Sequence, residues 1–358
     1  MPKNRSRESP QEAPNAVGGL HVAQRSTVRI LSPVERAWLA GVIDGEGSIF
    51  IARVLVKSGY SRRGFFYKAF LSVANSNEDI VRRIREVIGM GFVGLTIEKR
   101  RDWRDKWEYK GSPSVLRGIL PQILPYLIIK QEVAKTMLRY LEFIESNPID
   151  GSMKVPEGYH EKLDSLYLGV KRLNEKGRDV PGDQLALASR PVNLNDRRPG
   201  NRFKAFRQMS EKECAWLAGV IDGEGSILLS KVFNRLYRRG FFYRPQLEIS
   251  NSNRAFLIRI AETIGEGTVH RNKKGDAATK TRWAYIASAG VLRAVLPQIL
   301  PYVIVKRERV KKMLEFFDFI DTHPLWGLKQ VDPSYYKMLD PFYLTLKKLN
   351  KKGKQTAI

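Results

Sequence analysis

Residues 38–49 read Trp-Leu-Ala-Gly-Val-Ile-Asp-Gly-Glu-Gly-Ser-Ile, and residues 216–227 read the same twelve letters. Two identical strings of this length indicate that the chain holds two copies of one unit. Other blocks recur in the same order, at 62–67 and 238–243, 75–77 and 251–253, and 115–130 and 291–306. A unit of about 145 residues has the size of an ordinary domain and is too long for a solenoid repeat.

The duplication divides the chain into a first lobe at residues 31–177 and a second lobe at residues 210–353. Residues 1–30 carry several arginines and no apolar core, and are predicted to be a disordered basic tail. Residues 178–209 are rich in Pro, Gly, Asn, Asp and Arg without periodicity, which is typical of a linker.

Each lobe is predicted to begin with a capped helix, because Ser32-Pro33-Val34-Glu35 reads as a capping box and residues 210–213 repeat it. Alternation of polar and apolar residues at 67–74 and 244–250 predicts sheets with one buried face and one polar face. The predicted order in each lobe is α-β-β-α-β-β-α followed by further helices, which is an α+β fold. In the first lobe we expect strands at 48–56, 67–74, 92–100 and 107–110, and later helices at 78–88, 115–120, 131–144 and 163–174.

The charge of the chain is unusual. It holds 62 Lys and Arg against 37 Asp and Glu, which gives +25 and a pI near 10.1. Residues 1–31 contribute +3 and residues 178–209 contribute +4, so +18 remains on the two lobes and the last five residues. Folded domains this basic are typical of polyanion binders, and a duplicated protein suits a partner with two-fold symmetry, such as double-stranded DNA. The alternative is a basic protein without a nucleic-acid partner.

Composition also excludes several classes of protein. The single cysteine, Cys214, excludes an internal disulfide and a cysteine-based zinc site, and the four histidines have no spacing typical of a metal site. No apolar run reaches the roughly 18 residues that a membrane span needs, and the first residues do not resemble a secretory signal. We therefore expect an intracellular, DNA-associated protein without membrane contact, in an organelle or in bacterial or archaeal cytoplasm.

Four glycines recur on one face of the repeated helix: Gly41 and Gly45, and their copies Gly219 and Gly223. Each pair lies one turn apart, so two helix backbones could touch there. The duplication favours contact between the two repeated helices at a pseudo-two-fold axis, within one monomer. The alternative is that each helix packs its glycines on its own sheet.

Residues 39–47 and 217–225 resemble the LAGLIDADG motif of the homing endonucleases, and two copies in one chain resemble the monomeric, two-repeat branch of that family. The resemblance covers both lobes. It implies a site-specific endonuclease that makes double-strand breaks, with the motif helices packed at the lobe interface and the antiparallel sheets forming a saddle in the DNA major groove. The chain departs from the motif name at Gly45, where the name has Ala, and at Glu46, where it has Asp.

The resemblance also implies a metal site. The last acidic position of each motif, Glu46 and Glu224, would bind divalent metal beside Gly45 and Gly223. Independently, carboxylates at helix C-termini are disfavoured, and two of them brought together favour a hard cation such as Mg²⁺. Mn²⁺ or Ca²⁺ is expected to substitute for binding. The alternative for both glutamates is a solvated helix end.

Two further pairs match catalytic positions of the family. Asn75 and Asn251 correspond to residues that order water near the metal, although an Asx turn before the next helix would equally explain them. Lys130 and Lys306 correspond to an active-site lysine, and the alternative is a surface lysine on a helix.

DNA contacts are expected from the polar sheet faces and the strand-connecting loops. Arg and Gln can read guanine and adenine edges, whereas Lys more often holds phosphate. For Arg53 and Lys231 the sequence leaves the face open. The candidates are Lys68, Arg244, Gln246, Arg62, Arg63, Arg238, Arg239, His270, Asn272, Arg53 and Lys231.

Two rival functions remain at this stage. The first is an RNA-splicing maturase on the same fold, with RNA as a possible partner. The second is a DNA-binding regulator that has lost cleavage. Retention of both acidic residues disfavours each of them but does not exclude a dual activity.

Overall fold

The computed structural model describes residues 28–56, 63–97, 105–149, 155–175, 207–235, 240–273, 281–323 and 333–351. Lobe one is the part from residue 28 to residue 175. Its elements are α1 (Pro33–Glu46), β1 (Gly47–Leu55), β2 (Phe65–Asn75), α2 (Glu78–Ile88), β3 (Phe92–Thr96), β4 (Lys106–Gly111), α3 (Pro113–Ile123), the 3₁₀ turn η1 (Leu124–Tyr126), α4 (Gln131–Ser146) and α5 (Tyr159–Glu175).

Lobe two, from residue 207 to residue 351, repeats this order. Its elements are α6 (Glu211–Glu224), β5 (Gly225–Phe233), β6 (Phe241–Asn251), α7 (Arg254–Ile264), β7 (Thr268–Lys273), β8 (Arg282–Ala287), α8 (Ala289–Ile299), α9 (Arg307–Thr322) and α10 (Pro333–Lys351). The predicted α+β fold with two similar lobes is therefore confirmed. Helix α3 runs past Pro121, where the sequence predicted an end, because Ile123 on its last turn is fully buried.

Within the described residues, the strands form two four-stranded antiparallel sheets with the orders β1-β2-β4-β3 and β5-β6-β8-β7. The register pairs Phe50 with Phe70 in one sheet and Leu228 with Gln246 in the other. Side chains alternate between the faces, so Leu71 and Leu247 are buried while Lys68 and Arg244 are exposed. We call the face that carries Lys68 or Arg244 the open face of each sheet. The opposite face is covered by helices.

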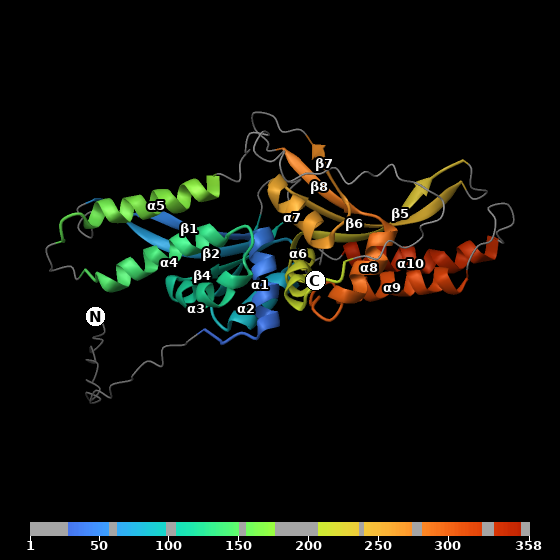
Figure 1. Ribbon diagram of the computed structural model, residues 1–358, viewed down its shortest axis with the longest axis horizontal. Coiled ribbons are helices and arrows are strands. Elements are labelled where there is room, and N and C mark those ends of the chain that lie inside the picture. Colours follow the sequence, from blue (N-terminus) through green and yellow to red (C-terminus); the bar gives the residue numbers. More distant parts are fainter. Residues whose placement is uncertain are drawn as a thin grey trace, which may run out of the picture.

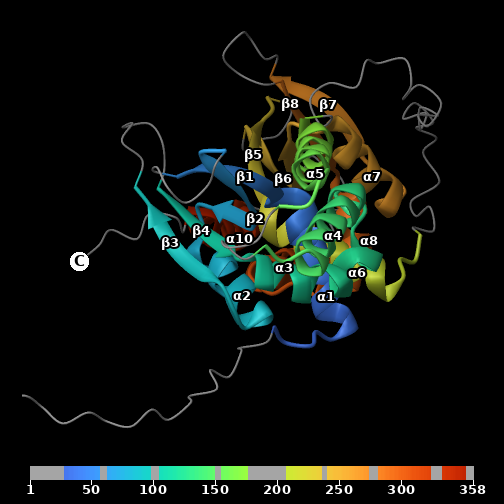
Figure 2. The same cartoon turned by 90° about the vertical axis from the view of Figure 1, so that its left-hand side faces the viewer.

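The motif helices lie side by side at the centre of the molecule, with lobe one on one side and lobe two on the other (Figure 1). Both begin with the predicted capping box, in which Ser32 and Glu35, or Ser210 and Glu213, exchange hydrogen bonds between side chain and backbone. Seen from the side of lobe one, α1 to α5 lie together against their sheet (Figure 2). The two motifs therefore lie at one contact between the lobes.

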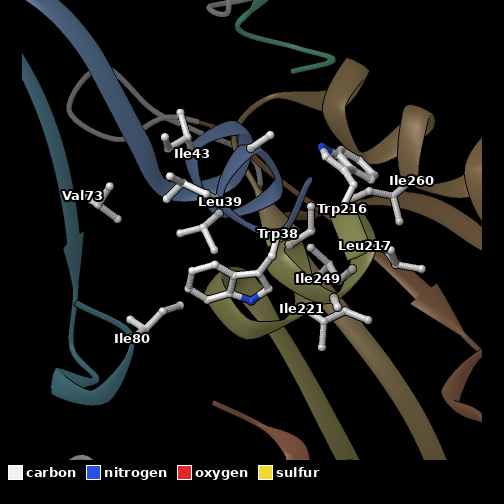
Figure 3. Close-up of a cluster of buried hydrophobic side chains, with 14 of the residues drawn as sticks. Trp38, Leu39, Ile43, Val73, Ile80, Trp216, Leu217, Ile221, Ile249 and Ile260 are labelled. Atoms are coloured by element: carbon white, nitrogen blue, oxygen red, sulfur yellow. The ribbon is translucent and has the colours of Figure 1, made fainter. Parts of the chain in front are cut away.

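Apolar side chains surround both motif helices. Leu39, Ile43, Leu217 and Ile221 are fully buried, and they lie in one cluster with side chains from both lobes (Figure 3). A helix that is buried on nearly all sides belongs in the middle of a core. The two lobes thus share one hydrophobic core, and the interface between them is part of the folding unit.

Segments before each motif helix pack in the same way. The backbone N–H groups of Leu31 and Met209 donate to the side chains of Gln122 and Gln298, at 2.8 and 2.9 Å. The Arg29 guanidinium binds the carbonyl of Glu86 at the end of α2. Residues 28–30 and 207–209, which the sequence assigns to tail and linker, therefore contact the lobes. Residues 1–27 and 178–206 lie outside the described part of the chain.

No helix of the described residues is long and apolar enough to cross a membrane.

Candidate active site and DNA interface

The two motif helices approach closely at glycines. A Cβ atom built on Gly41 would lie 2.0 Å from the Trp216 carbonyl oxygen, and one built on Gly219 would lie 2.1 Å from that of Trp38. The contact is therefore glycine against the backbone of the partner tryptophan, rather than glycine against glycine. One turn later, a Cβ built on Gly45 would lie 3.2 Å from Glu224 Cγ, and one built on Gly223 would lie 3.3 Å from Glu46 Cγ. This approach brings the two glutamates together.

Two tryptophans connect the lobes reciprocally. Trp38 Nε1 donates to Asp222 Oδ2 at 2.9 Å, and Trp216 Nε1 donates to Asp44 Oδ2 at 3.0 Å. All four side chains are buried. The sequence did not predict these bonds, although a tryptophan at the same place in both motif copies was the signal that could have indicated them.

Asp44 and Asp222 hold the loops that follow η1 and α8. Asp44 accepts the backbone N–H groups of residues 128, 129 and 130 at 2.8–3.2 Å, and Asp222 accepts those of 304, 305 and 306 at 2.8–3.1 Å. Each carboxylate therefore joins its own lobe to the tryptophan of the other. The aspartates act as braces, and their oxygens are occupied by N–H donors.

Lys130 and Lys306 occupy the C-terminal ends of the motif helices. Lys130 Nζ donates to the carbonyls of Ile43 and Asp44 at 2.7 and 2.6 Å. Lys306 Nζ donates to those of Ile221, Asp222 and Gly223 at 2.7, 2.8 and 3.2 Å. The carbonyls of Ile43 and Ile221 also accept the N–H of the C-cap glycines, Gly47 and Gly225, and a cation offsets the negative end of the helix dipole. The alternative of a surface lysine is wrong, since burial lowers the pKa of both ammonium groups.

Each glutamate meets the asparagine at the end of the second strand of its lobe. Asn75 Nδ2 donates to Glu46 Oε1 at 2.5 Å, and Asn251 Nδ2 donates to Glu224 Oε1 at 2.8 Å. The other amide atom, Oδ1, accepts the N–H of residue 77 or 253 at 2.8 Å. The Asx turn is therefore present, and the other end of each amide reaches the carboxylate. The ordering of water by these asparagines stays a prediction.

The glutamates are only partly accessible, and the pKa of each is raised. Burial is the main cause for both, and the negative charge of Glu46 raises the pKa of Glu224 further. The ammonium groups of Lys130 and Lys306 act in the opposite direction. The lysines thus provide part of the positive charge that we expected a metal alone to supply.

The atoms around Glu46 and Glu224 suit a hard divalent cation that keeps several waters. They are carboxylate oxygens with backbone carbonyls nearby, and Mg²⁺ is commonly held by one or two carboxylates plus water and substrate phosphate. Among the described residues, no group of three or more His, Cys, Asp or Glu side chains could enclose a metal. The donor set therefore fits an ion completed by water and a phosphodiester.

We expect the metal-free protein to lose stability as the pH rises from 5 to 7. A carboxyl whose folded pKa is raised holds a proton that the unfolded chain releases near pH 4.5, so stability present at low pH is lost as the folded form ionises. The change is on the order of 1–2 kcal/mol. Thermal unfolding in EDTA measures it, with the Glu46→Gln, Glu224→Gln double variant as control. A variant with the same pH dependence as the natural protein would contradict this assignment.

Replacing Asp44 by alanine should lower the free energy of unfolding by about 3–5 kcal/mol, because it leaves buried N–H donors without their acceptor and removes the negative charge near the buried Lys130 ammonium. Urea denaturation measures the loss. Glu132→Ala is the matched control, since Glu132 is an exposed partner of Lys135 and should change stability by less than about 1 kcal/mol. Equal effects for the two variants would show that the hydrogen bonds to Asp44 do not stabilise the protein.

The pairing of the strands shows on which sheet face each predicted DNA-contacting residue lies. Lys68, Arg244, Gln246 and His270 all lie on the open faces. Asn272 lies at a register shift between Arg271 and Lys273, where the pairing of β7 with β8 is irregular. Lys106 and Lys110 of β4 share the open face of lobe one through their pairing with Thr96 and Phe92, and the sequence analysis missed them. Arg62, Arg238 and Arg239 lie outside the described residues.

Three predicted DNA contacts are placed elsewhere. Arg53 pairs in register with Tyr67 and lies over the Phe65 ring at 3.8 Å, while Lys231 lies over Phe241 at 4.2 Å, so both belong to the helix-covered side. The Arg63 guanidinium donates to both carboxylate oxygens of Asp164 in α5, at 2.8 and 2.7 Å. The face that the sequence left open for Arg53 and Lys231 is thus the helix-covered one, and Arg63, expected in a hairpin loop, is held by a helix carboxylate. Whether these three residues contact DNA stays a prediction.

Comparison with known proteins gives consistent results. No protein-family model matches the chain. The DNA endonuclease I-CvuI of Chlorella vulgaris is 28% identical over 103 residues, which make up 28% of this chain and 61% of that protein. The chain thus matches less than two thirds of the length of this curated relative.

Solved structures match over most of the chain. The I-SmaMI endonuclease, bound to an uncleaved DNA target in the presence of calcium ions, aligns with a TM-score of 0.60 at 16% identity, covering 89% of this chain and 99% of that one. The LAGLIDADG homing endonuclease I-LtrWI, bound to target DNA, aligns with a TM-score of 0.59 at 14% identity, covering 87% and 96%. I-GzeII, in complex with its DNA target, aligns with a TM-score of 0.57 at 15% identity, covering 88% and 97%.

At these identities the structural matches show the fold, and the two motif copies and the curated relative agree with it. By motif and by fold, the chain is similar to the LAGLIDADG homing endonucleases that carry both motifs in a single chain.

Proposed function

We propose that the chain is a site-specific endodeoxyribonuclease that makes metal-dependent double-strand breaks in a long DNA target. One observation carries this proposal: two partly buried carboxylates, Glu46 and Glu224, meet at the ends of two crossing helices in a protein of charge +25. The relatives support it, since each is named as an endonuclease and several were solved with DNA. Lobes at 31–177 and 210–353, each extended by the short segment that precedes it, would bind one half of the target.

The residues have distinct roles in this proposal. Glu46 and Glu224 provide oxygen ligands to Mg²⁺, for which Mn²⁺ or Ca²⁺ would substitute in binding, and the carbonyls of Gly45 and Gly223 lie beside them. When bound, such ions activate water and stabilise the leaving oxygen of the phosphodiester. Asn75 and Asn251 orient the carboxylates through their Nδ2 groups. Lys130 and Lys306 fix the helix ends and add positive charge beside the developing negative charge.

The test is a cleavage selection. Purified protein is incubated with a randomised duplex library in Mg²⁺, and the enriched sequence is placed in a plasmid. We expect one double-strand break per site, which EDTA prevents and Mn²⁺ supports. Cleavage that EDTA leaves unchanged would exclude metal dependence. Selective binding of folded RNA without any DNA cleavage would favour a maturase, and specific DNA binding without cleavage in Mg²⁺ or Mn²⁺ would favour a regulator.

Affinity for the duplex should fall steeply with salt. A protein that neutralises six to ten phosphates loses about 10³–10⁵ in affinity between 50 and 200 mM salt, and the basic lobes provide enough Lys and Arg for that number. Fluorescence anisotropy in Ca²⁺, which is expected to support binding, measures the slope. An affinity that stays constant over this range would show that phosphate contacts do not dominate binding.

A further inference from the structure

The open face of lobe one is unexpectedly aromatic. Phe50 and Phe70 pair across β1 and β2, with ring centroids 5.7 Å apart and ring planes inclined by 30°. Phe92 on β3 is 66% exposed and lies over Gly94 of the same strand. Phe50 and Phe70 are half-buried. Phenylalanine on a sheet face that packs on no helix has no role in the core. These three rings, which we call the lobe-one aromatic group, therefore need another explanation.

Lobe two has different residues at the same positions. Leu228 corresponds to Phe50, Gln246 to Phe70 and Thr268 to Phe92. A hollow of about 230 Å³ lies at the edge of this face, lined by Arg244, Gln246, Thr268 and Ile286 together with residues 288, 289 and 291 at the start of α8. Polar side chains and free space thus replace two aromatic rings, although the backbone pairing of the two sheets is the same.

The two lobes also differ in net charge, and lobe two is the more basic. Residues 31–177 hold 24 basic and 18 acidic residues, a net +6, whereas residues 210–353 hold 25 and 14, a net +11. Lobe one as a whole is therefore the less basic of the two lobes, and its open face carries the three phenylalanines. If the open faces bind DNA, the two lobes meet it with different chemistry.

In the major groove, the base edges present hydrogen-bonding groups and one apolar group, the C5-methyl of thymine. Phenylalanine can contact only the latter, while Arg and Gln donate to guanine or adenine. Building on the proposed function, we propose that lobe one recognises its half of the target by apolar contact of Phe50, Phe70 and Phe92 with pyrimidine C5-methyl groups. Lobe two recognises its half through hydrogen bonds from Arg244 and Gln246.

Deoxyuridine substitution tests the proposal directly. Uracil lacks the C5-methyl and keeps every hydrogen-bonding group of thymine. The selected target is prepared with deoxyuridine in one half, in the other half, or in neither, and affinity is measured by anisotropy in Ca²⁺. We expect a loss of roughly 3–5-fold per contacted methyl in the lobe-one half, from the transfer energy of one buried carbon, and no loss in the lobe-two half. Deoxycytidine replaced by 5-methyldeoxycytidine at a contacted position should not weaken binding.

The halves are assigned independently of affinity. An iron chelate attached to cysteine in a Phe233→Cys variant cleaves the half bound by lobe two, because Phe233 is 82% exposed at the end of β5 and the natural Cys214 is buried. Substitutions at Phe70 and at the equivalent Gln246 test the contact with the methyl group. Phe70→Ala should remove the sensitivity to deoxyuridine, Phe70→Leu should keep most of it, and Gln246→Ala at the equivalent position should leave it unchanged.

The outcomes separate the two proposals. Failure to bind any duplex overturns the proposed function and this inference with it. Three results with specific binding would overturn the inference alone. Deoxyuridine could weaken binding equally in both halves, or only in the lobe-two half. The half bound by lobe one could also contain no thymine. Sensitivity that persists in a folded Phe70→Ala variant would exclude Phe70 as the contact.

Discussion

Glutamine in place of either Glu46 or Glu224 is expected to abolish double-strand cleavage while specific DNA binding stays largely intact. The substitution keeps the size of the side chain and leaves an amide oxygen that can accept the hydrogen bond from Asn75 or Asn251. It removes one of the two negative charges that would attract the metal. Because altering even an outer partner of a metal ligand costs about 10–100-fold in activity, loss of the ligand itself should cost more than about 100-fold.

The measurement is plasmid linearisation in Mg²⁺ together with anisotropy in Ca²⁺. Residual nicking of one strand is compatible with two similar centres, and inactivity of both strands would indicate metals shared between them. Glu132→Gln is the matched control, because Glu132 is exposed and only pairs with Lys135 on α4. Cleavage at the natural rate by the Glu46→Gln, Glu224→Gln double variant would show that the carboxylates are not catalytic.

Most of the fold could be predicted from the sequence, because the duplication repeats each pattern in a second copy. A capping box at Ser32 is a weak signal by itself, but its copy at Ser210 makes a coincidence improbable. The alternation around Lys68 was ambiguous at Phe70, and the clearer copy around Arg244 settled which face is open. Helix ends were harder to predict, because the burial of a residue such as Ile123 depends on distant parts of the chain.

The site was only partly predictable for a similar reason. Glu46 and Glu224 could be named from the motif, but their partners depend on how the two lobes meet. The bond from Trp38 to Asp222 joins residues 184 positions apart, and no local pattern specifies it. Arg53 shows the same limit within one lobe, since a shift of one position along the strand decides which face it occupies. Sequence patterns therefore identified the reactive groups, and packing determined what holds them.

Gly41→Leu is expected to destabilise the protein beyond the about 1–3 kcal/mol that overpacking usually costs. The first atom of any side chain at this position would lie 2.0 Å from the Trp216 carbonyl oxygen, which is backbone and cannot rotate away. The helices would have to separate, which breaks the bonds from Trp38 to Asp222 and from Trp216 to Asp44 and moves Glu46 away from Glu224. Gly169→Ala is the matched control, because its Cβ would meet only Thr136 Cγ2 at 3.4 Å and alanine favours the helix by about 0.5–1 kcal/mol. Thermal unfolding and plasmid cleavage measure both variants, and a Gly41→Leu protein with unchanged melting temperature would mean that the motif helices do not form the lobe interface.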